Sequence, residues 1–273
     1  MSIKSILLHL SQDSRNAART AAALGLAETH GAHVTALYTM SPPQLPAYVM
    51  GYVPPDLLQK YVDDARAEAA AEQVRFAAAA KARGIATEWR LEEGQPHDIL
   101  ARQARYADLV VIGQPEEDNQ APATADLPDE LTLTSGRPVL TIPYAGEFDR
   151  IGRKILVAWN GSREGARAVH DALPLLKAAD EVVVYGVNVS TADHLPGADI
   201  AQSLARHGVS VRVEHSVARD ISVGDALLGA LSDEGADLLV MGAYGHSRVR
   251  ELALGGATRQ VLRHMTAPVL MSH

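Results

Sequence analysis

Hydrophobic and polar positions along the chain follow two alternating patterns. Short runs rich in Val, Ile and Leu, bounded by polar residues or glycine, predict buried strands. The longer stretches between them carry apolar residues every three or four positions, which predicts amphipathic helices. In the first half of the chain the predicted strands are Ile3–Leu10, His33–Tyr38, Thr87–Leu91, Leu109–Ile112 and Val139–Ile142. The predicted helices of that half are Arg15–Thr29, Asp56–Arg83 and His97–Tyr106.

The second half shows the same order of elements. Its predicted strands are Lys154–Trp159, Glu181–Val187, Val209–Glu214, Leu238–Met241 and Val269–Met271. One helix is predicted from a buried stripe of Ala166, Val169, Leu173 and Leu176, and a shorter helix is predicted to end at Gly208. Strands that alternate with helices predict an α/β fold, in which a parallel sheet carries helices on both faces.

The chain contains an internal repeat. The matching segments are Lys4–Leu8 with Arg153–Val157, Ala107–Gly113 with Ala236–Gly242, and Arg137–Leu140 with Ala267–Leu270. Self-similarity of this kind predicts two homologous units. We place repeat one at residues 1–144 and repeat two at residues 153–273, with Tyr144–Gly152 as the linker between them.

A glycine-rich loop follows the fourth predicted strand of repeat two. Gly242, Gly245 and Gly255 are separated by two and by nine residues, and Gly256 follows directly. Glycine lacks the Cβ atom that would keep a ligand away from the backbone, and the N-terminus of a following helix attracts anions. This spacing behind an apolar strand favours a phosphate-binding loop over glycines that only shape turns.

The loop resembles the ATP-binding signature of the universal stress protein family. The resemblance covers nearly the whole chain, because Val157–Ser162 and the final strands Arg137–Leu140 and Ala267–Leu270 also match the family's pattern. It implies two tandem five-stranded Rossmann-like units. In this family the last strands pair two units across a twofold axis, so the resemblance implies a fused pseudo-twofold dimer.

The resemblance also implies where an adenine nucleotide would lie. In open parallel sheets, ligands bind beyond the carboxyl ends of the strands. Adenine is expected near Ala158 and Val187, and the phosphates at the glycine loop. The candidate nucleotide-binding residues are Ala158, Trp159, Asn160, Val187, Met241, Gly242, Gly245, His246, Arg248, Gly255, Gly256, Ala257 and Thr258.

Two of these positions depart from the family's pattern. Asn160 stands where nucleotide-binding members commonly have Asp, which removes a charge that helps to hold a magnesium ion. Gly256 replaces the usual Ser or Thr and removes a hydroxyl donor, and a hydrogen bond to a charged group is worth about 1.5–3 kcal/mol. We therefore expect that the site binds ATP, ADP or AMP weakly, with or without Mg²⁺, and two alternatives stay open: that it favours AMP or ADP, or that nucleotide binding is lost.

Repeat one is predicted not to bind nucleotide. After Gly113 it lacks the second glycine, and residues 116–118 are all acidic where phosphate would need donors. Asp126, Asp129 and Glu130 follow, and negative charge repels phosphate. Pro115 also removes one backbone donor.

Composition and absent motifs narrow the function further. A net charge of −8 disfavours nucleic-acid and anionic-membrane surfaces, and the absence of cysteine excludes disulfides and thiolate metal sites. The sequence has no P-loop motif, dinucleotide fingerprint or hydrolase nucleophile elbow. Its first apolar run is too short for a signal peptide and no stretch approaches the ~20 apolar residues of a membrane span, so we expect a cytoplasmic protein.

These features favour a stress-response protein that binds an adenine nucleotide in repeat two and regulates rather than catalyses. No catalytic residue or metal ligand is assigned, because no general base or carboxylate pair stands at the loop. The family implies a homodimer, and we expect a further protein partner. Two alternatives stay open: a nucleotide-independent interaction scaffold and a slow ATP hydrolase. Residues 41–55, rich in Pro and Tyr, are interpreted as a lid, a partner contact or a loop packed on its own unit.

Overall fold

The computed structural model describes residues 2–42, 52–115, 126–188, 197–245 and 256–273. The first half contains β1 (Ser5–Leu10), α1 (Asn16–His30), β2 (His33–Met40), α3 (Pro55–Ala82), β3 (Thr87–Glu93), α4 (Pro96–Ala104), β4 (Leu109–Gly113), α5 (Leu127–Thr134) and β5 (Val139–Ile142). The second half contains β6 (Lys154–Ala158), α6 (Arg163–Asp171), α7 (Leu173–Ala178), β7 (Glu181–Val187), α8 (Ala198–Arg206), β8 (Val211–Ser216), α9 (Val223–Asp233), β9 (Leu238–Gly242), α11 (Ala257–His264) and β10 (Val269–Ser272).

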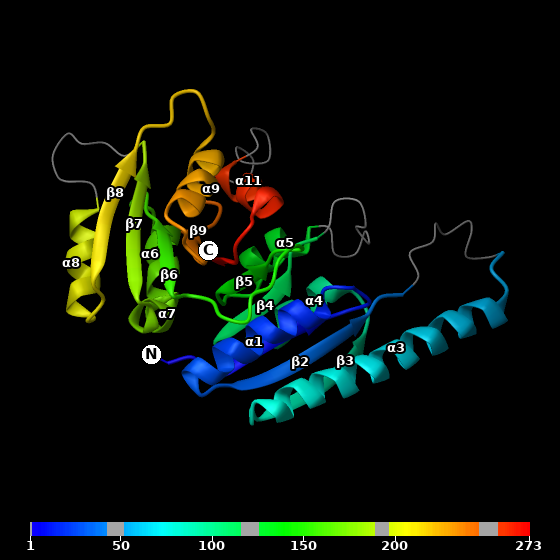
Figure 1. Ribbon diagram of the computed structural model, residues 1–273. Coiled ribbons are helices and arrows are strands. Elements are labelled where there is room, and N and C mark those ends of the chain that lie inside the picture. The colour runs from blue at the N-terminus through cyan, green and yellow to red at the C-terminus, as the bar shows by residue number, and fades with distance from the viewer. Residues whose placement is uncertain (1, 43–51, 116–125, 189–196, 246–255) are drawn as a thin grey trace.

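The strands of the described residues form one ten-stranded sheet. Its order is β3-β2-β1-β4-β5-β10-β9-β6-β7-β8. The strands within each half pair in parallel, whereas β5 and β10 are antiparallel, with Leu140 opposite Leu270. Figure 1 shows the two halves side by side, joined at these strands. The predicted α/β class and the pairing of the two last strands are confirmed.

The helices cover both faces of the sheet and bury three apolar clusters. Alternation along β1 shows why, since Ile6 and Leu8 face the largest cluster and Leu7 faces another. The largest cluster is continuous across both halves and packs under α1, α3, α6 and α7. The opposite face carries separate clusters under α4 and α5 and under α9 and α11. On one face of the sheet, the two halves therefore share a single hydrophobic core across the junction of β5 and β10.

All ten predicted strands are found, whereas one predicted helix is divided in two and helices α5 and α9 were not predicted. The stripe expected on one helix is divided between α6 and α7, because Pro174 lacks an amide hydrogen and clashes with the preceding turn. Ala166 of that stripe is exposed, and Gly165 lies in the core instead. Helix α5 was not predicted, since its first residue, Leu127, is followed by a proline and two acids.

Helix α3 is unusual for its length of 28 residues and projects beyond the end of β3 (Figure 1). Its first turns expose apolar side chains: Leu57 is 56% exposed, and Tyr52, just before the helix, is 89% exposed. Residues 43–51 of the Pro/Tyr-rich segment lie outside the described residues. No helix in the described parts of the chain combines the length and apolar character needed to cross a bilayer.

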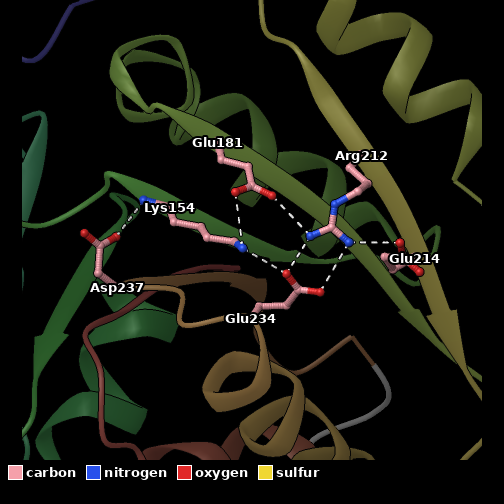
Figure 2. A network of polar contacts seen from close by, with 6 residues as sticks. All are labelled: Lys154, Glu181, Arg212, Glu214, Glu234 and Asp237. Atoms are coloured by element: carbon pink, nitrogen blue, oxygen red, sulfur yellow. Dashed lines mark hydrogen bonds and ion pairs between the residues drawn. The ribbon is translucent and has the colours of Figure 1, made fainter.

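A network of ion pairs ties the amino ends of the repeat-two strands together (Figure 2). Arg212 of β8 reaches Glu181 of β7 at 3.1 Å, Glu214 of its own strand at 2.9 Å and Glu234 after α9. Lys154 of β6 adds contacts to Glu181 and Glu234 at 3.2 and 3.0 Å. The two cations thus cross-link three strands and one helix end, away from the strands' carboxyl ends.

Replacing Arg212 by methionine is expected to lower the urea midpoint at pH 7 more than replacing Arg153, for which Asp180 is the one ion-pair partner among the described residues. Hydrogen bonds, first from Arg212, hold the pKa values of Glu181 and Glu234 below their ordinary value of 4.5. A lowered carboxylate pKa stabilises the fold above the ordinary value, and this contribution is lost as the pH falls through the lowered one. The midpoint difference between Arg212→Met and wild type should therefore shrink as the pH is lowered below 4.5; a difference that stays constant as the pH falls contradicts an electrostatic origin.

Candidate functional site

A cavity of about 490 Å³ opens beyond the carboxyl ends of β6 and β9 in repeat two. This is the edge where parallel sheets commonly bind ligands, and the volume lies in the range of small-molecule sites. Its lining comes from three strands, β6, β7 and β9, two helices, α9 and α11, and the loops beside them. The lining residues are Ala158, Trp159, Asn160, Ser162, Tyr185, Val187, Ser222, Val223, Leu227, Met241, Gly242, Tyr244, Gly245, Gly256, Ala257 and Thr258.

Part of this lining is apolar and aromatic. Tyr185 and Val187 alternate on β7 and so share one face of the sheet, and Met241 lies near the end of β9. Leu227 closes the cavity from α9. Surfaces of this type bury a flat, weakly polar ring at little desolvation cost.

The remaining lining is formed by backbone and small polar residues, and α11 supplies its main electrostatic feature. Gly256 is the N-cap of α11 and carries no side chain to occupy the first amides. The first turn, Ala257-Thr258-Arg259, contains no acid. The first amides of α11, to which the cap residue offers no side chain, and the positive end of the helix dipole therefore lie at this side of the cavity, an arrangement that favours an anion.

Gly242 and Gly245 have a packing role that sequence spacing alone does not show. A Cβ atom on Gly242 would lie 2.5 Å from the carbonyl carbon of Glu164 and would also overlap the amide of Gly165. A Cβ on Gly245 would lie 3.0 Å from the Glu164 carboxylate. The first turn of α6 thus packs directly against the loop, and glycine at these two positions makes that contact possible.

The start of α6 is fixed by two local hydrogen bonds. Ser162 accepts the Gly165 amide at 3.0 Å and is the N-cap of α6. The side-chain oxygen of Asn160 accepts the Ser162 amide at 3.0 Å. Asn160 therefore shapes the turn after β6, a task for which its amide serves as well as a carboxylate.

Glu164 is a functional-site neighbour that sequence reasoning missed. Its side chain is buried behind the glycine loop and is paired with Arg163 at 2.7 Å. Burial alone would raise the pKa of this carboxyl, but hydrogen bonds from its own amide and from Arg163 hold the pKa below its ordinary value. Glu164 thus stays charged close to the loop, and its pairing with Arg163 limits its effect on a nearby anion.

The structure gathers ten of the thirteen predicted site residues around this one cavity. The other three, His246, Arg248 and Gly255, lie outside the described residues. The residues missed by sequence reasoning are Ser162, Tyr185, Ser222, Val223, Leu227 and Tyr244. Tyr185 had an available signal, because it stands two positions before Val187 on the same strand. Ser222 had another, as a helix-capping serine followed three residues later by an acid.

The equivalent edge of repeat one is built differently. Arg19 of α1 lies against Gly113, the counterpart of Gly242, and is 2% exposed. Its guanidinium is held by Asp13 at 2.7 Å and by Asn16. His9 stands where repeat two has Ala158, and burial, assisted by Arg19, lowers its pKa to about 3. Neutral His9 and internally paired Arg19 therefore occupy this edge with the chain's own side chains.

Two of the acids of repeat one also contact repeat two. Residues 116–118 lie outside the described residues, but Asp126 and Asp129 are described and face repeat two. Asp129 accepts a hydrogen bond from the hydroxyl of Tyr244, and Asp126 lies 3.9 Å from Arg259. These carboxylates thus contact the neighbouring repeat as well as standing at the N-terminus of α5.

Comparison with known proteins agrees with this architecture. A sequence model of the universal stress protein family matches residues 3–121 and 152–273. A universal stress protein from Synechocystis is 31% identical over 138 residues, 49% of this chain and 46% of that protein, so the match spans about half of the relative's length. The chain belongs to the universal stress protein family.

Solved structures support the fold over the full length. The crystal structure of a universal stress protein from Archaeoglobus fulgidus is similar over 98% of this chain and 95% of that chain, with a TM-score of 0.78 and 17% identity. A functionally unknown protein from Pseudomonas aeruginosa is similar over 99% of this chain and 92% of its own, with a TM-score of 0.54 and 16% identity. Similarity at such low sequence identity shows the fold but does not identify a ligand.

Proposed function

We propose that this universal stress protein binds an adenine nucleotide in the repeat-two cavity and acts as a regulatory protein. One observation carries the proposal: a single cavity joins an apolar, aromatic lining to the N-terminus of α11, whose cap residue is the glycine Gly256. A nucleotide has the matching halves, a flat base and an anionic phosphate chain. Adenine would lie against Tyr185 and Val187, and the phosphates would face Gly256 and Thr258.

Repeat one is proposed to lack nucleotide binding and to serve as the structural partner of repeat two. At the N-terminus of α5, Asp126 stands at the position of Gly256, and Asp129 and Glu130 add charge to the first turn. These carboxylates lie at the N-terminus of α5, where a phosphate would have to bind, and their negative charge offsets the positive end of the helix dipole. The expected stoichiometry is one nucleotide per chain.

Calorimetric titration of the purified protein tests the proposal. ATP, ADP and AMP should be titrated separately, with and without Mg²⁺, after carried-over nucleotide has been removed and identified by chromatography. We expect one site per chain, with the nucleotide's adenine required and inosine analogues bound more weakly. The absence of heat at millimolar ligand overturns the proposal, and two sites per chain overturns the role given to repeat one.

We further propose that the protein acts in the cytoplasm and that two chains associate as a homodimer. Slow ATP hydrolysis is the catalytic alternative. Steady-state phosphate release above background, removed together with nucleotide binding, would favour that alternative. Sedimentation of the protein with and without ligand tests the dimer.

A nucleotide-independent interaction scaffold is the second candidate function. The observation that favours it is the exposed apolar surface of Tyr52, Leu57 and Tyr61 at the start of α3, of which Tyr61 is 39% exposed. Apolar side chains exposed together commonly mark a contact with another protein. Loss of partner binding in Leu57→Ser, with nucleotide binding unchanged, would separate this function from the first.

A further inference from the structure

Tyr244 joins the repeat-two cavity to repeat one. Tyr244 lines the cavity, and its backbone amide donates to the hydroxyl of Thr258 on α11 at 3.4 Å. Its own hydroxyl donates to the carboxylate of Asp129, on α5 of repeat one. One residue therefore contacts the ligand space, the phosphate-facing helix and the neighbouring repeat.

The backbone of Tyr244 is in an unfavourable conformation. Its φ angle is 57°, in the left-handed region that bulky residues rarely adopt. Such a conformation persists only where the surroundings hold it, and it concentrates at ligand sites. Of the contacts described for Tyr244, the hydrogen bond to Asp129 is made by its side chain to a charged group and is the stronger kind.

Repeat one also holds the far end of the same helix. The side-chain amide of Gln114 donates to the carbonyls of Leu262 and Arg263, both at 2.9 Å, in the last turn of α11. Gln114 is 5% exposed, so these bonds are shielded from water. Its own oxygen accepts the amide of Tyr144 at 3.1 Å. Helix α11 is thus connected to repeat one near its N-terminus through Tyr244 and at its C-terminus through Gln114.

The contact between Tyr244 and Asp129 has no mirror image among the described residues. Pro115 occupies the position in repeat one that Tyr244 occupies in repeat two, and proline has no hydroxyl to donate. Arg259 is the counterpart of Asp129 on α11, and it pairs with Asp126 instead. Among the described residues, Asp129 of repeat one thus supports a residue of the repeat-two cavity, and the equivalent positions do not form the reverse contact.

We infer that Asp129 of repeat one is a positioning residue for the repeat-two ligand site. By accepting the Tyr244 hydrogen bond it holds the strained tyrosine as a wall of the cavity, so that the site is built by both repeats. The identity of the ligand rests on the proposed function, whereas the position of Tyr244 does not. The structural and the ligand-binding consequences are therefore tested separately.

The first test needs no ligand. Hydrogen exchange of the full-length protein reports on the amides of residues 242–245. We expect these amides to exchange at least about fivefold faster in Asp129→Ala and in Tyr244→Phe than in wild type, because the loop loses its anchor. Glu130→Gln is the matched control, since it removes the same charge from the same helix turn without touching Tyr244. Equal exchange in Asp129→Ala and Glu130→Gln overturns the inference, whether or not nucleotide binds.

The second test measures ADP affinity by calorimetry in the same variants. Asp129→Ala and Tyr244→Phe are each expected to weaken binding about tenfold, as loss of a charge-assisted hydrogen bond would. The double variant should be no weaker than either single one, and Asp129→Asn, which keeps an acceptor, should recover part of the affinity. Additive effects, or no change in affinity, contradict a positioning role. If wild type binds no nucleotide while the exchange difference holds, the proposed function fails and the position of Tyr244 stands.

Discussion

Replacing Gly256 by aspartate is expected to weaken nucleotide binding at least about 30-fold without destabilising the fold. Gly256 has ordinary helix-start dihedral angles, with φ −54° and ψ 160°, so a side chain fits its backbone. Aspartate is among the best N-cap residues and should stabilise α11 by a few tenths of a kcal/mol relative to glycine. Its charge would lie where phosphate is expected, and two like charges ~4 Å apart near a surface repel by about 4 kcal/mol. Half of that energy already corresponds to about 30-fold in affinity.

The matched control is Gly256→Asn, which has the same shape and no charge. Asparagine caps the helix as well as aspartate does, so it should leave ADP affinity within about threefold of wild type. Gly256→Ser, which supplies the hydroxyl found in the family's pattern, should tighten binding about tenfold. Calorimetry gives the affinities and urea unfolding gives the stabilities. If Asp and Asn weaken binding equally, the N-terminus of α11 is not the anion site.

In repeat one, aspartate naturally occupies the position equivalent to Gly256. Asp126 occupies the N-cap of α5 at the position of Gly256, and the rest of that turn is acidic too. The first prediction therefore asks whether the difference between the two repeats can be transferred by one side chain. A negative answer would direct attention to Arg19, whose guanidinium lies against Gly113 at the equivalent edge of repeat one.

Much of the fold could be predicted because its strands are buried on both faces. The continuous apolar runs in β1, β4 and β9 are short, as is typical of strands buried in a parallel sheet. Helix α5 could not be predicted in the same way, because its eight residues are held by packing rather than by an apolar stripe. The break at Pro174 was predictable from proline's missing amide hydrogen, but the regular spacing of Val169, Leu173 and Leu176 concealed it.

Some residues of the candidate site could also be predicted from the sequence, and others could not. Residues at strand ends and in the glycine loop could be placed, because strand order alone brings the carboxyl ends of β6 and β9 together. The contact between Tyr244 and Asp129 joins residues 115 positions apart in different repeats, and no local pattern indicates it. The packing role of Gly242 was likewise hidden, because glycine spacing does not distinguish room for a ligand from room for a helix.

That distinction leads to the second large effect. Gly242→Ala is expected to destabilise the protein by about 3 kcal/mol, at the upper end of overpacking costs. The added Cβ would lie 2.5 Å from the carbonyl carbon and 2.9 Å from the carbonyl oxygen of Glu164, which are backbone atoms that cannot rotate away. Helix α6 or strand β9 would have to move, and both border the cavity. Urea unfolding, followed by circular dichroism, measures the change in midpoint.

Gly229→Ala provides the matched control for this substitution. Gly229 lies inside α9, and a Cβ added there would meet no atom of another part of the protein within 4 Å, so alanine should stabilise the helix by about 0.5–1 kcal/mol. The same chemical change is thus expected to act with opposite sign at the two glycines. If Gly242→Ala unfolds at the wild-type midpoint, α6 does not pack against the loop as described. If it is destabilised while Gly256→Asp is not, the glycine loop combines two separate functions, helix packing at Gly242 and anion binding at Gly256.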